Sequence, residues 1–134
     1  MGEDVNLPDY KEHTINKVYQ TTVDKLKENY IKPQESATRC DVRFAEITNA
    51  SGFGLRFEAV SKPFVFSASH YTSNQWAKAM HREDLVDLPT TCVNIDSSVL
   101  GAGSNACGPL PDKKDRVGSL SGKKLSFVVK PIGE

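Results

Sequence analysis

The chain has 134 residues, 38% of them hydrophobic, and its 17 basic side chains balance 17 acidic ones. This composition suffices for one domain, and the neutral charge balance gives no indication of nucleic acid or an anionic membrane as partner. The apolar runs, such as Phe64–Phe66, are too short to span a bilayer. No signal peptide is predicted, because the first residues lack a basic flank followed by an apolar core, and a cytoplasmic or periplasmic location stays open.

The cysteine pattern argues against a metal or disulfide framework. Cys40, Cys92 and Cys107 lie far apart, and no C-x-x-C pair occurs. An odd count in a domain of this size disfavours a set of disulfide bridges. We therefore expect at least two of the three to be ordinary buried or half-buried thiols, and we expect neither a metal nor a cofactor in this chain.

The first half of the chain predicts a short helix followed by strands. Apolar residues spaced i, i+3, i+7 over 23–30 permit a short helix. Two alternating runs, 40–47 and 53–59, are joined by the turn sequence Asn49–Gly52 and predict a β-hairpin. After a break at Pro63, residues 64–69 predict a third strand.

The second half contains the clearest helix signal. Thr72 and Gln75 fit a capping box, which predicts a helix from Ser73 to Arg82 with Trp76 and Met80 on one face. A short strand over 92–95, a glycine-rich loop over 101–109 and a strand over 125–130, closed by Pro131, follow. The sum predicts a single all-β domain over residues 1–134, an antiparallel β-sandwich with one short helix.

Several residues are candidates for chemistry, each with a structural alternative. The loop 101–108 lacks the Lys-Ser/Thr of a phosphate-binding P-loop, so a tight turn of small residues is the better interpretation. His70 and His81 are candidates to meet, with Asp84 or Asp96 as a carboxylate partner, but packed histidines with backbone partners are more common.

A sugar site is a further hypothesis. Glu35 is a candidate glycosidase carboxylate, although a retaining mechanism needs a second carboxyl about 5 Å away. Tyr71 and Trp76 are candidates to stack on a sugar ring, while Trp76 at helical spacing is more often a core anchor. Asn49-Ala50-Ser51 matches a glycosylation sequon, which we interpret as a chance occurrence in a turn.

The residues themselves carry a more specific signal. Five motifs occur in the same order as in the C-terminal domain of family-two bacterial β-galactosidases, which this chain resembles from residue 30 to residue 131. Residues 1–29 are similar more loosely, through Asn6 and Pro8-Asp9. The five motifs are Tyr30–Glu35 followed by Arg39–Arg43, Phe66–Tyr71, His81–Leu85, Asn94–Asp96 and Gly101–Pro109.

The resemblance implies a supersandwich of the galactose-mutarotase-like class. It also implies that the family domain is longer than this chain, that the chain is a fragment, and that the catalytic glutamates and metal sites lie in a preceding barrel domain. We therefore expect no catalytic residue here and no hydrolysis of β-galactosides by the isolated chain. The loop from Ser104 through Asn105 to Cys107 is expected to reach the rim of the sugar site, with Cys107 at a position that is aromatic in the family. Val5 and Tyr10 stand where the family has glutamate and arginine, so no role is transferred to them.

The leading hypothesis is thus an accessory, non-catalytic domain whose partners are the other domains of a β-galactosidase and, through them, a galactoside. One alternative is a sugar epimerase in its own right, with His70 and Glu35 as acid and base. Another is a carbohydrate-binding or self-association module, because an incomplete sandwich leaves strand edges and an apolar face uncovered. The residues expected on that face are Phe44, Phe57, Phe66 and Phe127.

Overall fold

The computed structural model describes residues 6–9, 15, 17–101, 110–119 and 121–133. Within these residues it contains two three-stranded antiparallel sheets, one α-helix and three short 3₁₀ helices. The elements in chain order are η2 (Val23–Leu26), β1 (Arg39–Val42), β2 (Phe44–Thr48), β3 (Gly54–Ala59), β4 (Phe64–Ser69), α1 (Ser73–Lys78), η3 (Arg82–Asp84), β5 (Cys92–Asp96), η4 (Lys113–Asp115) and β6 (Phe127–Ile132). The all-β class predicted from the sequence is confirmed.

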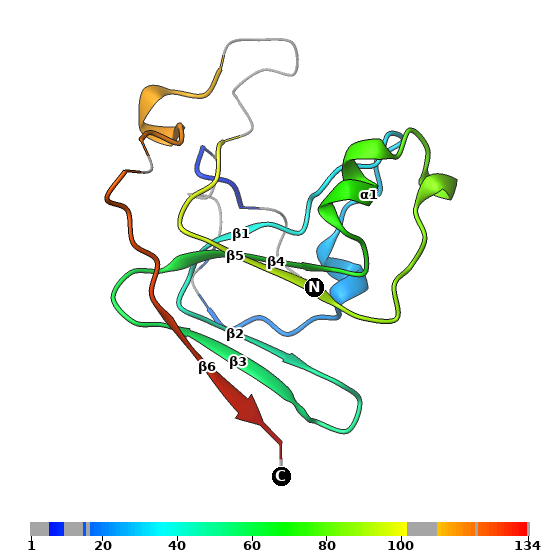
Figure 1. Cartoon of the computed structure of the whole chain (residues 1–134), viewed down its shortest axis with the longest axis horizontal. Helices are drawn as coiled ribbons and strands as arrows, with labels where there is room; N and C mark the ends of the chain where they lie inside the picture. Colours follow the sequence, from blue (N-terminus) through cyan, green and yellow to red (C-terminus); the bar gives the residue numbers. More distant parts are fainter. Residues whose placement is uncertain (1–5, 10–14, 16, 102–109, 120, 134) are drawn as a thin grey trace.

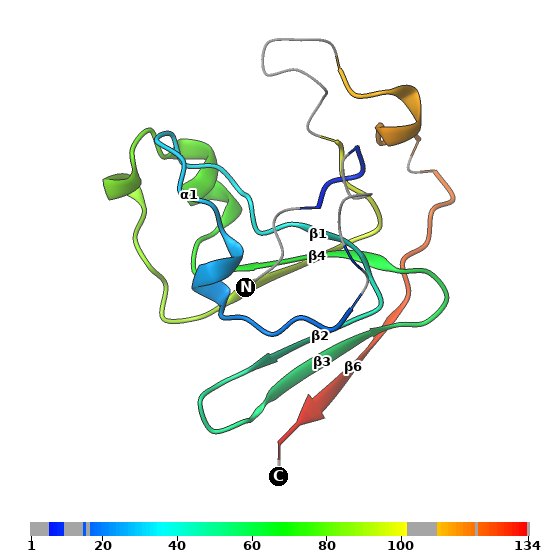
Figure 2. The same ribbon diagram turned by 180° about the vertical axis from the view of Figure 1, so that it is seen from behind.

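The two sheets form the layers of a sandwich. One sheet has the strand order β1-β4-β5 and the other β2-β3-β6, and every neighbouring pair is antiparallel. Figures 1 and 2 show the two sheets stacked on each other, with α1 at one end of the sandwich and η4 at the other. The segments around α1 and around η4 are therefore separated by the length of the sheets.

Phenylalanine rings from both sheets fill the space between the layers. Phe57 of β3 contacts Phe66 of β4, with ring centroids 6.4 Å apart, and Phe64 of β4 contacts Phe127 of β6 at 6.3 Å. Phe64 is only 1% exposed. Apolar side chains packed around this cluster include Val42, Ala45, Ile47, Ala59, Val93, Ile95 and Leu125. Fully burying a side chain of this size contributes roughly 1.5–3 kcal/mol, which is the order of the contribution expected from each of the buried rings Phe57, Phe64 and Phe66.

The predicted hairpin is confirmed, and its turn shows why this sequence forms it. The Asn49 side-chain oxygen accepts hydrogen bonds from the backbone N–H groups of Ser51 (2.9 Å) and Phe53 (3.1 Å). Gly52 has φ +83°, a left-handed conformation in which a side chain would be strained. The turn sets the register of the β2–β3 pair, in which Phe44 lies opposite Glu58 and Thr48 opposite Gly54. The sequon thus lies in a turn, and the Asn49 amide oxygen accepts two hydrogen bonds within that turn.

The alternating run that begins at Cys40 is split between the two sheets, which the sequence did not predict. Asp41 adopts a positive φ of 56° and the β1–β4 register shifts between Arg39 and Val42, so the chain leaves one sheet and enters the other at Arg43. The shift changes which face the following residues occupy. Phe44 consequently lies on the outer face of β2, under the Arg56 guanidinium at 4.1 Å, and the prediction of an inward-facing Phe44 is wrong.

Two element boundaries also differ from the sequence prediction. The helix α1 ends at Lys78 and η3 begins at Arg82, so Met80 lies beyond the helix and is 57% exposed. The last strand, β6, continues through Pro131 to Ile132. Proline lacks a backbone donor, but β6 is an edge strand and its free side does not require that donor.

The outer face of the β2-β3-β6 sheet carries a row of paired charges. Arg56 contacts Glu46 at 2.5 Å and Glu58 at 3.6 Å, and Lys130 contacts Glu58 at 2.8 Å. The Lys130 ammonium, followed by the Arg56 guanidinium, lowers the pKa of Glu58, while the hydrogen bond to Glu46 raises the pKa of Arg56. Because this face is open to solvent, the pairs contribute little stability each. Among the described residues no helix is long and apolar enough to cross a membrane.

Candidate functional site

The base of the glycine-rich loop is firmly held, although the loop itself lies outside the described residues. The backbone N–H of Gly101 donates to the Asp115 carbonyl at 3.1 Å, and Arg116 Nε donates to the Pro111 carbonyl at 2.6 Å. Gly101 is buried against the Asp9 carboxylate, where a Cβ would lie 2.7 Å from Asp9 Cγ. Asp9 belongs to residues 1–29, which resemble the β-galactosidase domain only loosely, and Gly101 begins one of the five matching motifs. The two segments are therefore in contact at this point. Ser104, Asn105 and Cys107, the predicted substrate-contacting residues, are not among the described residues.

Glu35 has a structural role in this fold. One carboxylate oxygen accepts from the Ala37 backbone N–H at 2.8 Å and the other from the Thr38 hydroxyl at 2.5 Å. Both oxygens therefore fix the buried segment that leads into β1. His70 Nδ1 lies 3.3 Å from the Thr90 carbonyl oxygen, a backbone partner of the kind expected for a structural histidine. In the described part of the chain no hydrogen bond or ion pair joins Glu35 to His70.

His81 and Asp84 are brought together, as part of a helix cap. One Asp84 oxygen accepts from the backbone N–H groups of Met80 and His81, both at 2.9 Å, and lies 3.9 Å from His81 Nδ1. The two backbone donors, that of His81 first, lower the pKa of the Asp84 carboxyl. His81 is exposed, and among the described residues no cluster of three or more His, Cys, Asp or Glu side chains could hold a metal ion. Of the cysteines, Cys40 is buried and Cys92 half-buried, both as free thiols, which confirms the prediction for two of the three.

The two aromatic residues that the sequence nominated for sugar stacking contact each other in the structure, which the sequence did not predict. The Tyr71 and Trp76 rings meet edge to face, with centroids 5.0 Å apart and planes at 73°. Two features of the sequence place them: the capping box begins α1 at Ser73, with the Gln75 N–H donating to Thr72 Oγ1 at 3.2 Å, and Ser69 Oγ accepts from the Tyr71 N–H at 3.1 Å. The predicted helix start is thus confirmed down to its hydrogen bonds.

Lys27 joins this pair from a distant part of the chain. Its ammonium lies 3.1 Å from the Tyr71 hydroxyl and 4.4 Å from the centroid of the Tyr71 ring. A cation over an aromatic face is attracted by the ring quadrupole. Forty-four positions separate the two residues, so no local sequence pattern indicates the contact.

Trp76 is not a core anchor, contrary to the structural interpretation of its spacing. It stays outside the phenylalanine cluster and lines two adjoining pockets on the surface. Its indole Nε1 is buried and has no hydrogen-bond partner among the described residues. Leaving a buried donor of this kind without a partner costs about 1–3 kcal/mol.

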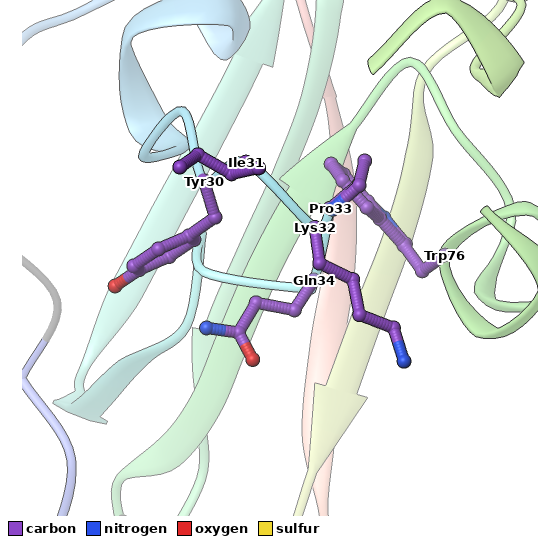
Figure 3. A pocket seen from close by; sticks show the side chains of 6 residues that line it. All are labelled: Tyr30, Ile31, Lys32, Pro33, Gln34 and Trp76. Atoms are coloured by element: carbon purple, nitrogen blue, oxygen red, sulfur yellow. The ribbon is translucent and has the colours of Figure 1, made fainter. Parts of the chain in front are cut away.

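The two pockets adjoin each other, because Tyr30, Pro33 and Trp76 line both. The more enclosed one has a volume of about 410 Å³ and is lined by Lys27, Glu28, Asn29, Tyr30, Pro33, Tyr71, Trp76, Arg82, Glu83 and Leu85. The more open one, about 600 Å³, is lined by residues 30–34 and Trp76. Figure 3 shows Pro33 against Trp76, with the Lys32 side chain extending along the same opening and Tyr30 directed to the other side.

The two stacked antiparallel sheets place the chain among the all-β sandwich domains. The sequence profile of the beta-galactosidase small chain family matches residues 1–129, and the chain belongs to this family.

Several curated proteins named beta-galactosidase are similar to the chain. The chain is 28% identical to that of Streptococcus thermophilus over 85% of its own length, and 31% identical to that of Actinobacillus pleuropneumoniae over 81%. A third relative, from Staphylococcus xylosus, is 32% identical over 68% of the chain. The matches cover 11%, 10% and 9% of these relatives, so the chain spans about a tenth of their length.

Proposed function

We propose that the chain is an accessory, non-catalytic C-terminal part of a β-galactosidase, an enzyme that hydrolyses terminal β-galactosides. The observation that carries this proposal is the family match over residues 1–129, combined with coverage of only about a tenth of the relatives. A chain of this size supplies a small share of such an enzyme, and the other domains are its natural partners. The galactose-mutarotase-like class of sandwich is part of the same proposal.

In this proposal the Ser104–Cys107 loop contributes to the rim of the sugar site. The support is the geometry at the base of the loop, where Gly101 and Pro111 are both buried and each takes part in a hydrogen bond to a later segment. Anchored ends restrict where a loop can extend, and functional loops are commonly positioned by a rigid scaffold in this way.

The contacts of Glu35 and His70 favour the accessory role over an epimerase. Acid–base chemistry needs two groups within reach of one substrate. Glu35 uses both oxygens to hold Ala37 and Thr38, and His70 lies beside the Thr90 carbonyl. These two nominated residues are therefore committed to different local contacts.

A chromogenic galactoside assay tests the proposal in two arms. The isolated chain is expected to give no hydrolysis. A chimaera in which the chain replaces the matching segment of the Actinobacillus pleuropneumoniae enzyme is expected to be active. In that chimaera, replacing Ser104, Asn105 and Cys107 together by glycine is expected to raise KM, because the rim contacts are lost.

The control replaces two exposed residues of the turn between β3 and β4, Ser61→Ala and Lys62→Ala, in the same chimaera and is expected to leave KM unchanged. Hydrolysis by the isolated chain that disappears on Glu35→Gln would contradict the accessory role. An unchanged KM in the loop variant would contradict the rim contact.

A further inference from the structure

We propose that the more enclosed pocket beside Trp76 is a second carbohydrate-binding site, for a neutral mono- or disaccharide. The pocket lies between the 27–33 segment and the α1–η3 segment. It is separate from the glycine-rich loop, whose base lies at the other end of the sandwich (Figures 1 and 2). The proposal does not rest on the role proposed for that loop.

The walls of the pocket suit the apolar faces of a sugar ring. Its volume of about 410 Å³ falls within the range of about 300–1,000 Å³ typical of small-molecule sites. Tyr30, Tyr71 and Trp76 contribute aromatic surface, and Pro33 and Leu85 contribute aliphatic surface. Trp76 and Tyr30 remain partly exposed, Tyr30 by 43%, so these rings are accessible to a ligand.

The charges around the pocket indicate a neutral ligand. Lys27 and Arg82 line it with positive charge, and Glu28 and Glu83 with negative charge, so the formal charges cancel. A site for a phosphate or carboxylate would carry an excess of cations, as Arg-rich anion sites do. Mixed donors and acceptors around aromatic surface instead match a ring with several hydroxyl groups, each of which both donates and accepts.

Three of these charged side chains, Glu28, Arg82 and Glu83, are available to a ligand. The Glu28 side chain is exposed and makes no hydrogen bond or ion pair within the described residues. Lys27 is already engaged with the Tyr71 hydroxyl and with Asp24, which it approaches to 3.8 Å. Within the described residues, the side chains of Arg82 and Glu83 make no hydrogen bond or ion pair, and both are exposed. Arg82 therefore offers a fork of donors, and Glu83 two acceptor oxygens, at the mouth of an aromatic pocket.

The chain carries its own reporter for this site, because Trp76 is its only tryptophan. The indole N–H gives a single resonance in a proton–nitrogen correlation spectrum. Methyl β-galactoside and lactose, titrated separately into the full 134-residue chain, are expected to shift this resonance saturably, with a Kd on the order of 1 mM for an open site with few contacts. Inorganic phosphate and glucuronate, as anionic probes, are expected to bind at least tenfold more weakly.

Substitutions that keep the reporter test the assignment. Arg82→Met and Glu83→Gln are each expected to weaken sugar binding at least fivefold without moving the indole resonance of the free protein. Arg43→Met, which removes an exposed arginine outside both pockets, is the matched control and is expected to leave the Kd unchanged.

Three results would overturn the proposal. One is the absence of any shift at sugar concentrations a hundredfold above the expected Kd, as for a surface that only contacts another domain. Another is equal or tighter binding of phosphate. The third is binding that Arg43→Met weakens as much as Arg82→Met. The KM of the loop variant of the chimaera is a separate measurement, so the failure of one proposal is distinguishable from that of the other.

Discussion

The contact between Phe64 and Phe127 is the sharpest test of the sandwich, because each ring comes from a different sheet. The ring centroids are 6.3 Å apart with planes at 58°, and Phe64 is 1% exposed. Aromatic pairs of this geometry contribute about 0.5–1.5 kcal/mol beyond the area that they bury. Phe64→Leu and Phe127→Leu each remove a ring while keeping most of the apolar volume. Combined in a double-mutant cycle, they are expected to show a coupling of about that size.

The assay is denaturant unfolding followed by circular dichroism, with the free energy of unfolding obtained by linear extrapolation. The control cycle combines Phe64→Leu with Phe53→Leu, because Phe53 lies in the hairpin turn and is 50% exposed. That cycle is expected to be additive within about 0.3–0.5 kcal/mol. Equal coupling in the two cycles would refute the reasoning that the two sheets share one aromatic core.

Three further predictions concern the cap, the acid response and association. Thr72→Ala removes the acceptor for the Gln75 N–H and is expected to lower the free energy of unfolding by about 1 kcal/mol. Thr72→Ser keeps the hydroxyl oxygen and is expected to lower it less. Equal decreases in the two variants would contradict a capping role for Thr72. The pKa of Asp84 is lowered in the fold, so the hydrogen bonds of its carboxylate stabilise the fold fully above the ordinary pKa of 3.8 and are lost as the pH falls through the lower folded pKa. Asp84→Asn is therefore expected to reduce the dependence of the free energy of unfolding on acid pH, measured by unfolding at a series of pH values. An unchanged pH profile would argue against this role of Asp84. The edge strand β6 exposes apolar side chains, among them Val128 (42% exposed) and Val129 (48% exposed). We therefore expect the chain to self-associate, so that the mass measured by light scattering rises with concentration and rises less in Val128→Lys. A monomer at every concentration would contradict this.

The turn and the cap are the parts of this fold that local sequence determined. Asn49 and Gly52 form the hairpin turn through a side-chain acceptor and a left-handed backbone, and both act within four residues. Thr72 and Gln75 fix the start of α1 in the same way. Such devices are predictable because their partners lie within a few positions along the chain. The alternation over 53–59 was predictable too, since β3 has one face on the core and the other in solvent.

The candidate site shows where this local information ended. The sequence indicated Tyr71 and Trp76 as a candidate pair, but no local pattern pointed to Lys27, Pro33 or Arg82 beside them. Helical spacing predicted that Trp76 would be buried with Met80, yet the helix ends before Met80 and Trp76 faces a pocket. Which face of a short helix is covered depends on segments that are distant in sequence.

Sequence alone therefore determined the class of the fold, the family resemblance, the hairpin turn and the start of α1. Only the tertiary structure decided how the strands were divided between two sheets. The run that begins at Cys40 alternates without interruption, and nothing within it indicates that Asp41 will turn the backbone to a positive φ. That change follows from pairing β1 with β4 and β2 with β3, contacts whose free energy comes from a shared core rather than from neighbouring residues. A shift of one residue in a strand exchanges its two faces, and for this reason Phe44 lies outside while Phe57 and Phe66 lie within.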